Sequence, residues 1–293
     1  MLARMELAPG APARNAGWIS VEVRDPVQGV ALALHILYPT LAAPRPAQFG
    51  PYEIEVALDA PVHGHGLPLV LISHGGGGSS LTHRDLAVGL ARARRVVVLL
   101  DHPGNNRADN SLQGTLANLA NRPRHVRLAI DAVLADGVIG PHLLDDKAAL
   151  IGHSMGGYTA LAAAGGKAVA GEAVAVAPDP RISALVLLAP ACGWFGADGA
   201  LAGVDVPIML RTAQRDELAH HLHADLVKQG VRDPARVDFQ VVPNAGHHAF
   251  QSPFPAGMAG PGFAPSQDPA GFDRAAYQPI LLAEILAFLD SVA

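Results

Sequence analysis

The chain has 293 residues, of which 50% are hydrophobic and 16% are charged, and its formal net charge is −5 at pH 7. This balance excludes intrinsic disorder, and 21 Lys and Arg against 26 Asp and Glu leave no basic surplus for a nucleic-acid partner. The single cysteine excludes an internal disulfide. One α/β domain of this length can bury a large core.

The first segment, residues 1–17, combines Pro, Gly and Ala with two Arg and has no sustained apolar run. We therefore expect a flexible N-terminal extension and no signal peptide. No segment reaches the ~18 uninterrupted apolar residues of a membrane span. A protein without a membrane span, cytoplasmic by default, is expected, although a chain trimmed of a leader would give the same sequence.

Residues 18–293 alternate predicted strands with predicted helices. Two antiparallel strands are expected first, at 19–24 and 30–38. Further strands are expected at 67–73, 95–100, 148–151, 184–188, 206–211 and 237–242, and helices at 81–94, 123–136, 157–164, 216–229 and 273–292. This alternation predicts a single domain with a mainly parallel sheet, covered by helices on both faces.

The pentapeptide Gly152-His153-Ser154-Met155-Gly156 has the form G-x-S-x-G and lies between a predicted strand and a predicted helix. A serine on such a turn adopts strained backbone geometry, with its Oγ exposed above the edge of the sheet. The glycines let the strand and the helix pass close together, and the helix N-terminus favours developing negative charge. Ser154 is therefore the predicted nucleophile.

A nucleophilic serine needs a base and an acid that orients the base. Asp216 is the first carboxylate beyond the strand at 206–211, and His247 follows the last strand. Glu217 and Asp205 compete with Asp216, which could also be a simple helix cap, and His248 competes with His247. Asp216 and His247 are favoured because both fall at the carboxyl edge of the sheet, in the chain order serine, acid, histidine.

An oxyanion hole needs two backbone N–H groups that point at the developing negative charge. The first is expected from Met155, the residue after the nucleophile. The second is expected from Gly76, in the H-G-G-G run that follows the strand at 67–73. We expect His74 to brace this loop rather than to take part in the chemistry.

Residues 251–271 form a long irregular loop, rich in Pro, Gly and Phe, that begins beside the predicted base. Loops of this length are usually functional, and we expect this one to line the acyl pocket. Candidate pocket residues are His153, Phe250, Phe254 and Phe263.

Histidines also gather at 63–65 and 220–223, but no Cys or carboxylate stands at a metal-ligand spacing from them. No metal and no cofactor are therefore expected.

Several segments together resemble bacterial α/β-hydrolases labelled predicted dienelactone hydrolases. They read S-H-G at 73–75, D-H-P-G-N at 101–105, G-H-S-M-G-G at 152–157, N-A-G-H at 244–247 and G-F-D-R-A-A at 271–276. The resemblance spans roughly residues 18–293 and extends to platelet-activating factor acetylhydrolases and, more distantly, to polyester-cleaving cutinase-like enzymes. It implies the α/β-hydrolase fold, with a mostly parallel sheet and an antiparallel N-terminal hairpin.

The same resemblance implies a triad of Ser154, Asp216 and His247 and oxyanion donors at Gly76 and Met155. True dienelactone hydrolases use a cysteine nucleophile, whereas this chain has a serine. The dienelactone label of the family therefore does not identify the substrate of this chain. The expected activity is cleavage of a small-molecule or polymeric carboxylic ester through an acyl-enzyme. Two alternatives remain open: an amide, peptide or polyamide hydrolase with the same triad, and a binding protein on an inactive hydrolase scaffold.

Overall fold

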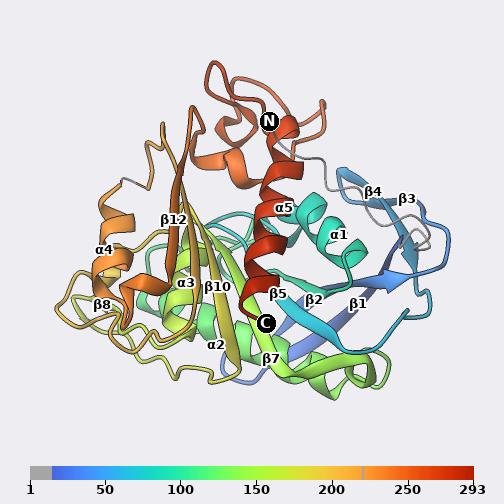
Figure 1. The fold of residues 1–293 in the computed structure, drawn as a ribbon, viewed down its shortest axis with the longest axis horizontal. Helices are drawn as coiled ribbons and strands as arrows, with labels where there is room; N and C mark the ends of the chain where they lie inside the picture. The colour runs from blue at the N-terminus through green and yellow to red at the C-terminus, as the bar shows by residue number, and fades with distance from the viewer. Residues whose placement is uncertain (1–14, 220) are drawn as a thin grey trace.

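The computed structural model describes residues 15–219 and 221–293. Strands and helices alternate along most of this length (Figure 1). The strands are β1 (Asn15–Asp25), β2 (Val30–Thr40), β3 (Arg45–Phe49), β4 (Tyr52–Leu58), β5 (Leu67–Ser73), β6 (Val96–Leu100), β7 (Leu143–His153), β8 (Val169–Ala170), β9 (Glu172–Ala173), β10 (Ile182–Leu188), β11 (Ile208–Ala213) and β12 (Val237–Val242). The helices are α1 (Arg84–Arg92), α2 (Leu116–Ala135), α3 (Met155–Ala163), α4 (Leu222–Gly230) and α5 (Arg274–Ser291).

Ten of the strands form one sheet in the order β12-β11-β10-β7-β5-β6-β2-β1-β4-β3. From β12 to β6 all neighbours are parallel, whereas β2 pairs antiparallel with both β6 and β1. The predicted N-terminal hairpin is therefore confirmed. The registers pair Gly152 with Ser73 and with Leu187, and pair Ala213 with Val242. The loops that follow β5, β7, β11 and β12 consequently emerge at one edge of the sheet.

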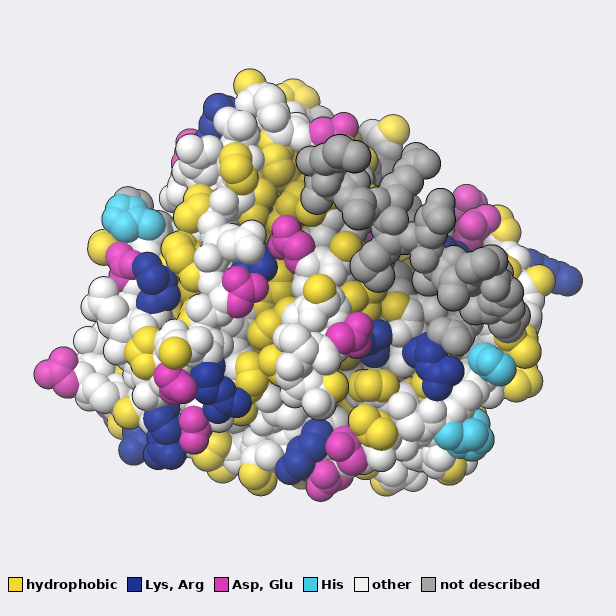
Figure 2. All heavy atoms as spheres, in the orientation of Figure 1, with side chains coloured by type: hydrophobic (Ala, Val, Ile, Leu, Met, Phe, Trp, Pro, Cys, Tyr) yellow, Lys and Arg dark blue, Asp and Glu magenta, His cyan; other side chains and the backbone are white. Residues whose placement is uncertain are grey.

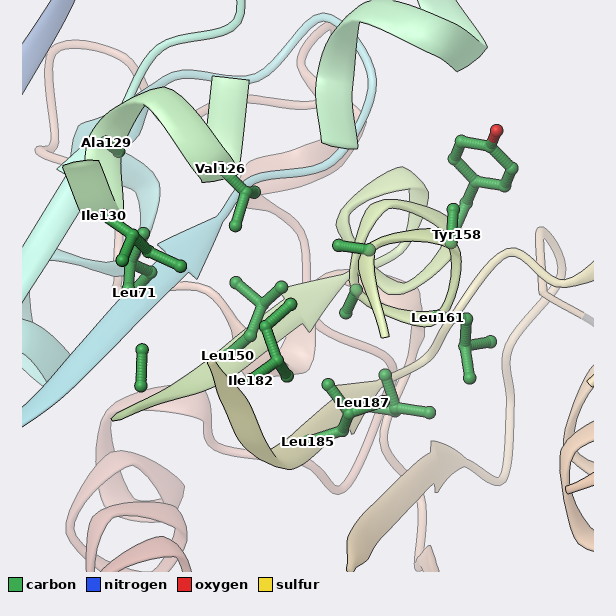
Figure 3. Packing of buried hydrophobic residues seen from close by; sticks show 14 of the residues in the cluster. Leu71, Val126, Ala129, Ile130, Leu150, Tyr158, Leu161, Ile182, Leu185 and Leu187 are labelled. Carbon is green, nitrogen blue, oxygen red and sulfur yellow. The ribbon is translucent and has the colours of Figure 1, made fainter. Parts of the chain in front are cut away.

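The helices cover both faces of the sheet because alternate residues of each buried strand point to opposite sides. In β6, Val96, Val98 and Leu100 belong to the cluster packed by α2 and α3, while Val97 and Leu99 belong to the cluster packed by α1 and α5. Figure 3 shows part of the first cluster, where side chains of α2 and α3 meet those of β5, β7 and β10. Two buried apolar clusters, one on each face, thus pack the sheet against its helices beneath its carboxyl edge.

Helix α2 begins seven residues earlier than predicted, because Pro123 lies in its interior rather than at its start. The Thr115 hydroxyl caps the first turn by accepting a backbone N–H. Proline cannot donate to the carbonyl four residues before it, which is that of Leu119. The Tyr158 hydroxyl donates to this carbonyl at 3.1 Å instead, so the interior proline leaves no unsatisfied acceptor there.

Three other expectations differ from the structure. The hairpin of β3 and β4 has no counterpart among the predicted strands. Helix α4 begins at Leu222 rather than at 216, because the Asp216 carboxylate accepts the backbone N–H groups of Leu218 and Ala219 in a separate turn. Of the extension predicted at 1–17, residues 1–14 lie outside the described part, and residues 15–17 already belong to β1.

Across residues 15–219 and 221–293, no helix combines the length and the apolar character needed to cross a bilayer. Figure 2 shows acidic and basic side chains intermingled over one face of the molecule.

Candidate active site

Ser154 occupies the sharp turn between β7 and α3, with φ of +54° and ψ of −117°. Non-glycine residues rarely adopt a positive φ, so the surrounding structure must hold this strain. The glycines make the turn possible: a Cβ on Gly152 would lie 2.1 Å from the carbonyl oxygen of Gly156, and one on Gly156 would lie 1.9 Å from that of Ser73. Ser154 is thus held where β7, α3 and the end of β5 approach one another closely.

The loop after β5 lies directly against the start of α3. A Cβ built on Gly75 would lie 3.2 Å from the Ser154 Cβ, and one on Gly76 would lie 3.8 Å from the Met155 Cβ. The Gly78 N–H donates to the Gly75 carbonyl at 3.1 Å, which closes the loop into a turn. N–H groups in the first turn of a helix have no partner within that helix, so Met155 can offer its own to an oxyanion.

His247 and Asp216 are joined by a hydrogen bond. His247 Nδ1 donates to the two carboxylate oxygens of Asp216 at 3.0 and 2.9 Å, and the two side chains are 7% and 3% exposed. Burial raises the pKa of Asp216, but the hydrogen bond and charge of His247 and two backbone N–H groups outweigh it, so the net shift is downward. Asp216 therefore stays ionised near neutral pH and can hold His247 in one tautomer.

The two competing residues, Asp205 and His248, are less well placed than Asp216 and His247. Asp205 precedes β11, at the far end of the strand from Asp216, and forms ion pairs with Arg232 and Arg236. His248 has no hydrogen-bond partner at its buried Nδ1. Burial and the nearby charges of His247 and Arg274 lower the pKa of His248 to about 4.

Ser154 and His247 line one cavity of about 370 Å³. No hydrogen bond joins their side chains. In hydrolases without substrate, catalytic hydrogen bonds are often long and shorten when the substrate binds. Of the residues predicted for this site, the cavity is also lined by Gly76, His153, Phe254 and Phe263.

Phe250 does not line this cavity, contrary to the prediction. The prediction placed it in the substrate pocket, but its side chain is fully buried in the core cluster shared by α1 and α5. Its ring lies 6.2 Å from that of Tyr277, and the residue belongs to a short helical turn that points it inward. The lining residues Phe254 and Phe263 come later in the loop, with their ring centroids 5.0 Å apart at right angles.

The sequence did not reveal Tyr52, Arg107, Leu218 and Gln251, which also line this cavity. Tyr52 lies in a hairpin that the pattern missed, and Arg107 lies in the loop after β6. Neither carries a local motif. The D-H-P-G-N segment before Arg107 was the one available signal, since it marks that loop.

Among the described residues, no cluster of three or more His, Cys, Asp or Glu is placed to hold an ion. His65 stacks on His142 at 4.5 Å, and His223 Nδ1 lies 3.1 Å from the backbone N–H of Cys192. His220 lies outside the described residues.

A mainly parallel sheet with a strained serine turn, and an acid and a histidine on later loops of the same edge, defines the α/β-hydrolase fold. A family model described as the alpha/beta hydrolase fold matches residues 68–216. The chain therefore belongs to the α/β-hydrolase family.

Three solved structures share the fold. A ferulic acid esterase from Streptomyces cinnamoneus has a TM-score of 0.70 at 20% identity, covering 97% of this chain and 92% of that one. A dienelactone hydrolase from Anabaena variabilis has a TM-score of 0.57 at 18% identity, covering 93% and 98%. A dienelactone hydrolase-like promiscuous phosphotriesterase from metagenomic libraries has a TM-score of 0.57 at 17% identity, covering 92% and 98%. A comparison with curated proteins finds no match.

Proposed function

We propose that this protein is a serine hydrolase that cleaves a carboxylic ester through an acyl-enzyme. One observation carries the proposal. A histidine held by a buried carboxylate lines the same cavity as a serine on a strained strand-to-helix turn. This arrangement is the one that nucleophilic catalysis by serine requires.

In the proposed reaction, Ser154 Oγ attacks the ester carbonyl carbon while His247 Nε2 accepts the hydroxyl proton. The negative charge that develops on the carbonyl oxygen is held by the N–H groups of Gly76 and Met155. His247 then returns the proton to the alcohol oxygen, the carbon–oxygen bond breaks, and the alcohol leaves. Water attacks the acyl-enzyme with His247 again as base, which releases the acid and restores Ser154. Asp216 orients the imidazole and stabilises its protonated form.

The names of the similar structures support an ester substrate, since one is an esterase and another hydrolyses a lactone. Their identities of 20% and 18% support the fold rather than a particular substrate.

A fluorophosphonate probe tests the nucleophile, because it phosphonylates only an activated serine. We expect one equivalent of label on the peptide that contains Ser154, and hydrolysis of p-nitrophenyl acetate that is lost in step with labelling. A binding protein on an inactive scaffold would take up no label. Faster turnover of an acyl p-nitroanilide than of its matched p-nitrophenyl ester would instead favour the amide hydrolase.

A further inference from the structure

A second cavity, of about 400 Å³, opens on the other side of Ser154. Ser154 and Gly76 border both cavities. His247 borders only the first cavity, and Met155 borders only the second. The lining of the second cavity also includes Leu116, Leu119 and Trp194. The nucleophile thus stands between two spaces of similar size.

Proton transfer decides which half of an ester each cavity can take. In the tetrahedral intermediate the carbonyl oxygen must point at the N–H groups of Gly76 and Met155. The alcohol oxygen must lie within hydrogen-bond reach of His247, because His247 gives it the proton on departure. The alcohol half is therefore directed into the cavity that His247 borders. The acyl half has only the other side of Ser154 left to it.

We propose that the first cavity binds the alcohol half of the substrate and the second binds the acyl half, an assignment that rests on the proposed function. The loop at 251–271 then selects the alcohol, which differs from the acyl pocket expected from the sequence. Both cavities fall in the size range of small-molecule sites, so the preferred ester is large on both sides of its carbonyl.

The linings indicate the chemical class of each half. In the first cavity Phe254 and Phe263 meet edge to face, and the Arg107 guanidinium lies 5.6 Å above the Phe263 ring. Such surfaces favour a flat aromatic alcohol. The second cavity combines apolar walls from Leu116, Leu119 and Trp194 with polar side chains that include Asn105 and Asn118. This lining suits a medium-length acyl group that is mainly apolar.

Two variants separate these roles. Phe254→Ala with Phe263→Ala opens the first cavity, and Leu116→Trp fills the second from a residue at the exposed start of α2. Phe272→Ala, at the residue that follows this loop and lines neither cavity, is the matched control. For each protein, kcat/KM is compared between benzyl and methyl acetate, and between p-nitrophenyl octanoate and acetate. Stopped-flow bursts give the deacylation rate constant.

We expect the double phenylalanine variant to lower the benzyl-to-methyl ratio about 10-fold and to change the octanoate-to-acetate ratio less than about 2-fold. Its deacylation rate constant should stay the same, because the alcohol has already left. Leu116→Trp should lower the octanoate-to-acetate ratio about 10-fold and leave the benzyl-to-methyl ratio unchanged. The reverse pattern, or no change in either ratio, overturns the assignment. Failure of the wild-type protein to hydrolyse any ester would instead overturn the proposed function.

A separate observation concerns Arg122, a fully buried cation on α2. Its guanidinium donates to Thr159 Oγ1 at 2.9 Å, to Asn105 Oδ1 at 2.7 Å, to Ser73 Oγ at 3.2 Å and to the carbonyl of His74. All four acceptors are neutral, and no ion pair joins Arg122 to an acid among the described residues. Burial lowers the pKa of Arg122 to about 9, which still leaves it charged at pH 7.

A buried charge without a counter-charge costs stability, so its placement calls for a reason. Arg122 reaches both sides of the oxyanion hole. The His74 carbonyl lies just before the glycine loop, and the Thr159 hydroxyl that accepts from Arg122 donates in turn to the Met155 carbonyl at 3.0 Å. We infer that Arg122 is a positioning residue that fixes both oxyanion donors and whose uncompensated charge favours the oxyanion. This inference also rests on the proposed function.

Turnover per titrated active site tests this role. Arg122→Met should lower kcat about 100-fold with KM within about 3-fold, and Arg122→Lys should restore part of the loss. Affinity for a trifluoromethyl ketone, which forms an oxyanion on Ser154, should fall in parallel with kcat. Affinity for the alcohol of the same skeleton should not change. Arg127→Met, a partly exposed arginine of the same helix, should leave all of these values in place.

If Arg122→Met does not fold, Thr159→Val provides the second variant, since it removes one link and keeps the charge. Thr159→Val should lower kcat about 10-fold. Variants that lose thermal stability but keep kcat per active site would show a purely structural role and overturn the inference.

Discussion

Replacing Ser154 by alanine should lower kcat for ester hydrolysis by about 10⁴ to 10⁶ without unfolding the protein. The loss is large because no other hydroxyl stands on the turn between β7 and α3, and the remaining oxyanion donors act only on a direct attack by water. The alanine keeps the Cβ, so packing against Gly75 is unchanged. Steady-state kinetics on p-nitrophenyl acetate, with fluorophosphonate labelling in parallel, provide the measurement.

A stability measurement on the same position tests the strained turn independently of catalysis. Glycine tolerates the φ of +54° that serine and alanine resist. Ser154→Gly should therefore unfold at a higher temperature than Ser154→Ala, with a difference of about 1 kcal/mol in unfolding free energy. An alanine variant that kept a tenth of the wild-type kcat would show that Ser154 is not the nucleophile.

The candidate nucleophile, acid and base could be proposed from the sequence because each follows a strand of the same parallel sheet. Parallel strands end at one edge, so Ser154, Asp216 and His247 are brought together by topology alone once the strands are recognised. The glycine pattern around Ser154 adds a local steric reason, which the distances at Gly152 and Gly156 quantify.

What the sequence missed depends on tertiary packing that leaves no local pattern. The predicted start of α2 at Pro123 is seven residues too late, because the Tyr158 hydroxyl makes a proline tolerable inside the helix. Phe250 and Phe254 differ by four positions and have the same side chain, yet one is in the core and the other lines a cavity. Arg122 resembles any helical arginine until its neutral partners are known.

His247→Ala should lower kcat by about 10⁶, close to the loss expected at Ser154, because serine and histidine act as one unit. His248→Gln should lower kcat by at most about 10-fold. The contrast follows from the structure: His247 Nδ1 is bound by Asp216, whereas His248 Nδ1 has no partner to orient it. The pKa of His248, lowered to about 4, also makes it a weak base.

Combining Ser154→Ala with His247→Ala checks that the two residues share one step. The double variant should be no slower than either single variant, since the first substitution already removes the acyl-enzyme route and leaves only oxyanion stabilisation and binding. Losses that multiplied would mean that His247 acts on a different step from Ser154. A loss at His248→Gln as large as that at His247→Ala would transfer the role of base to His248, and Asp216 would then be orienting the wrong imidazole.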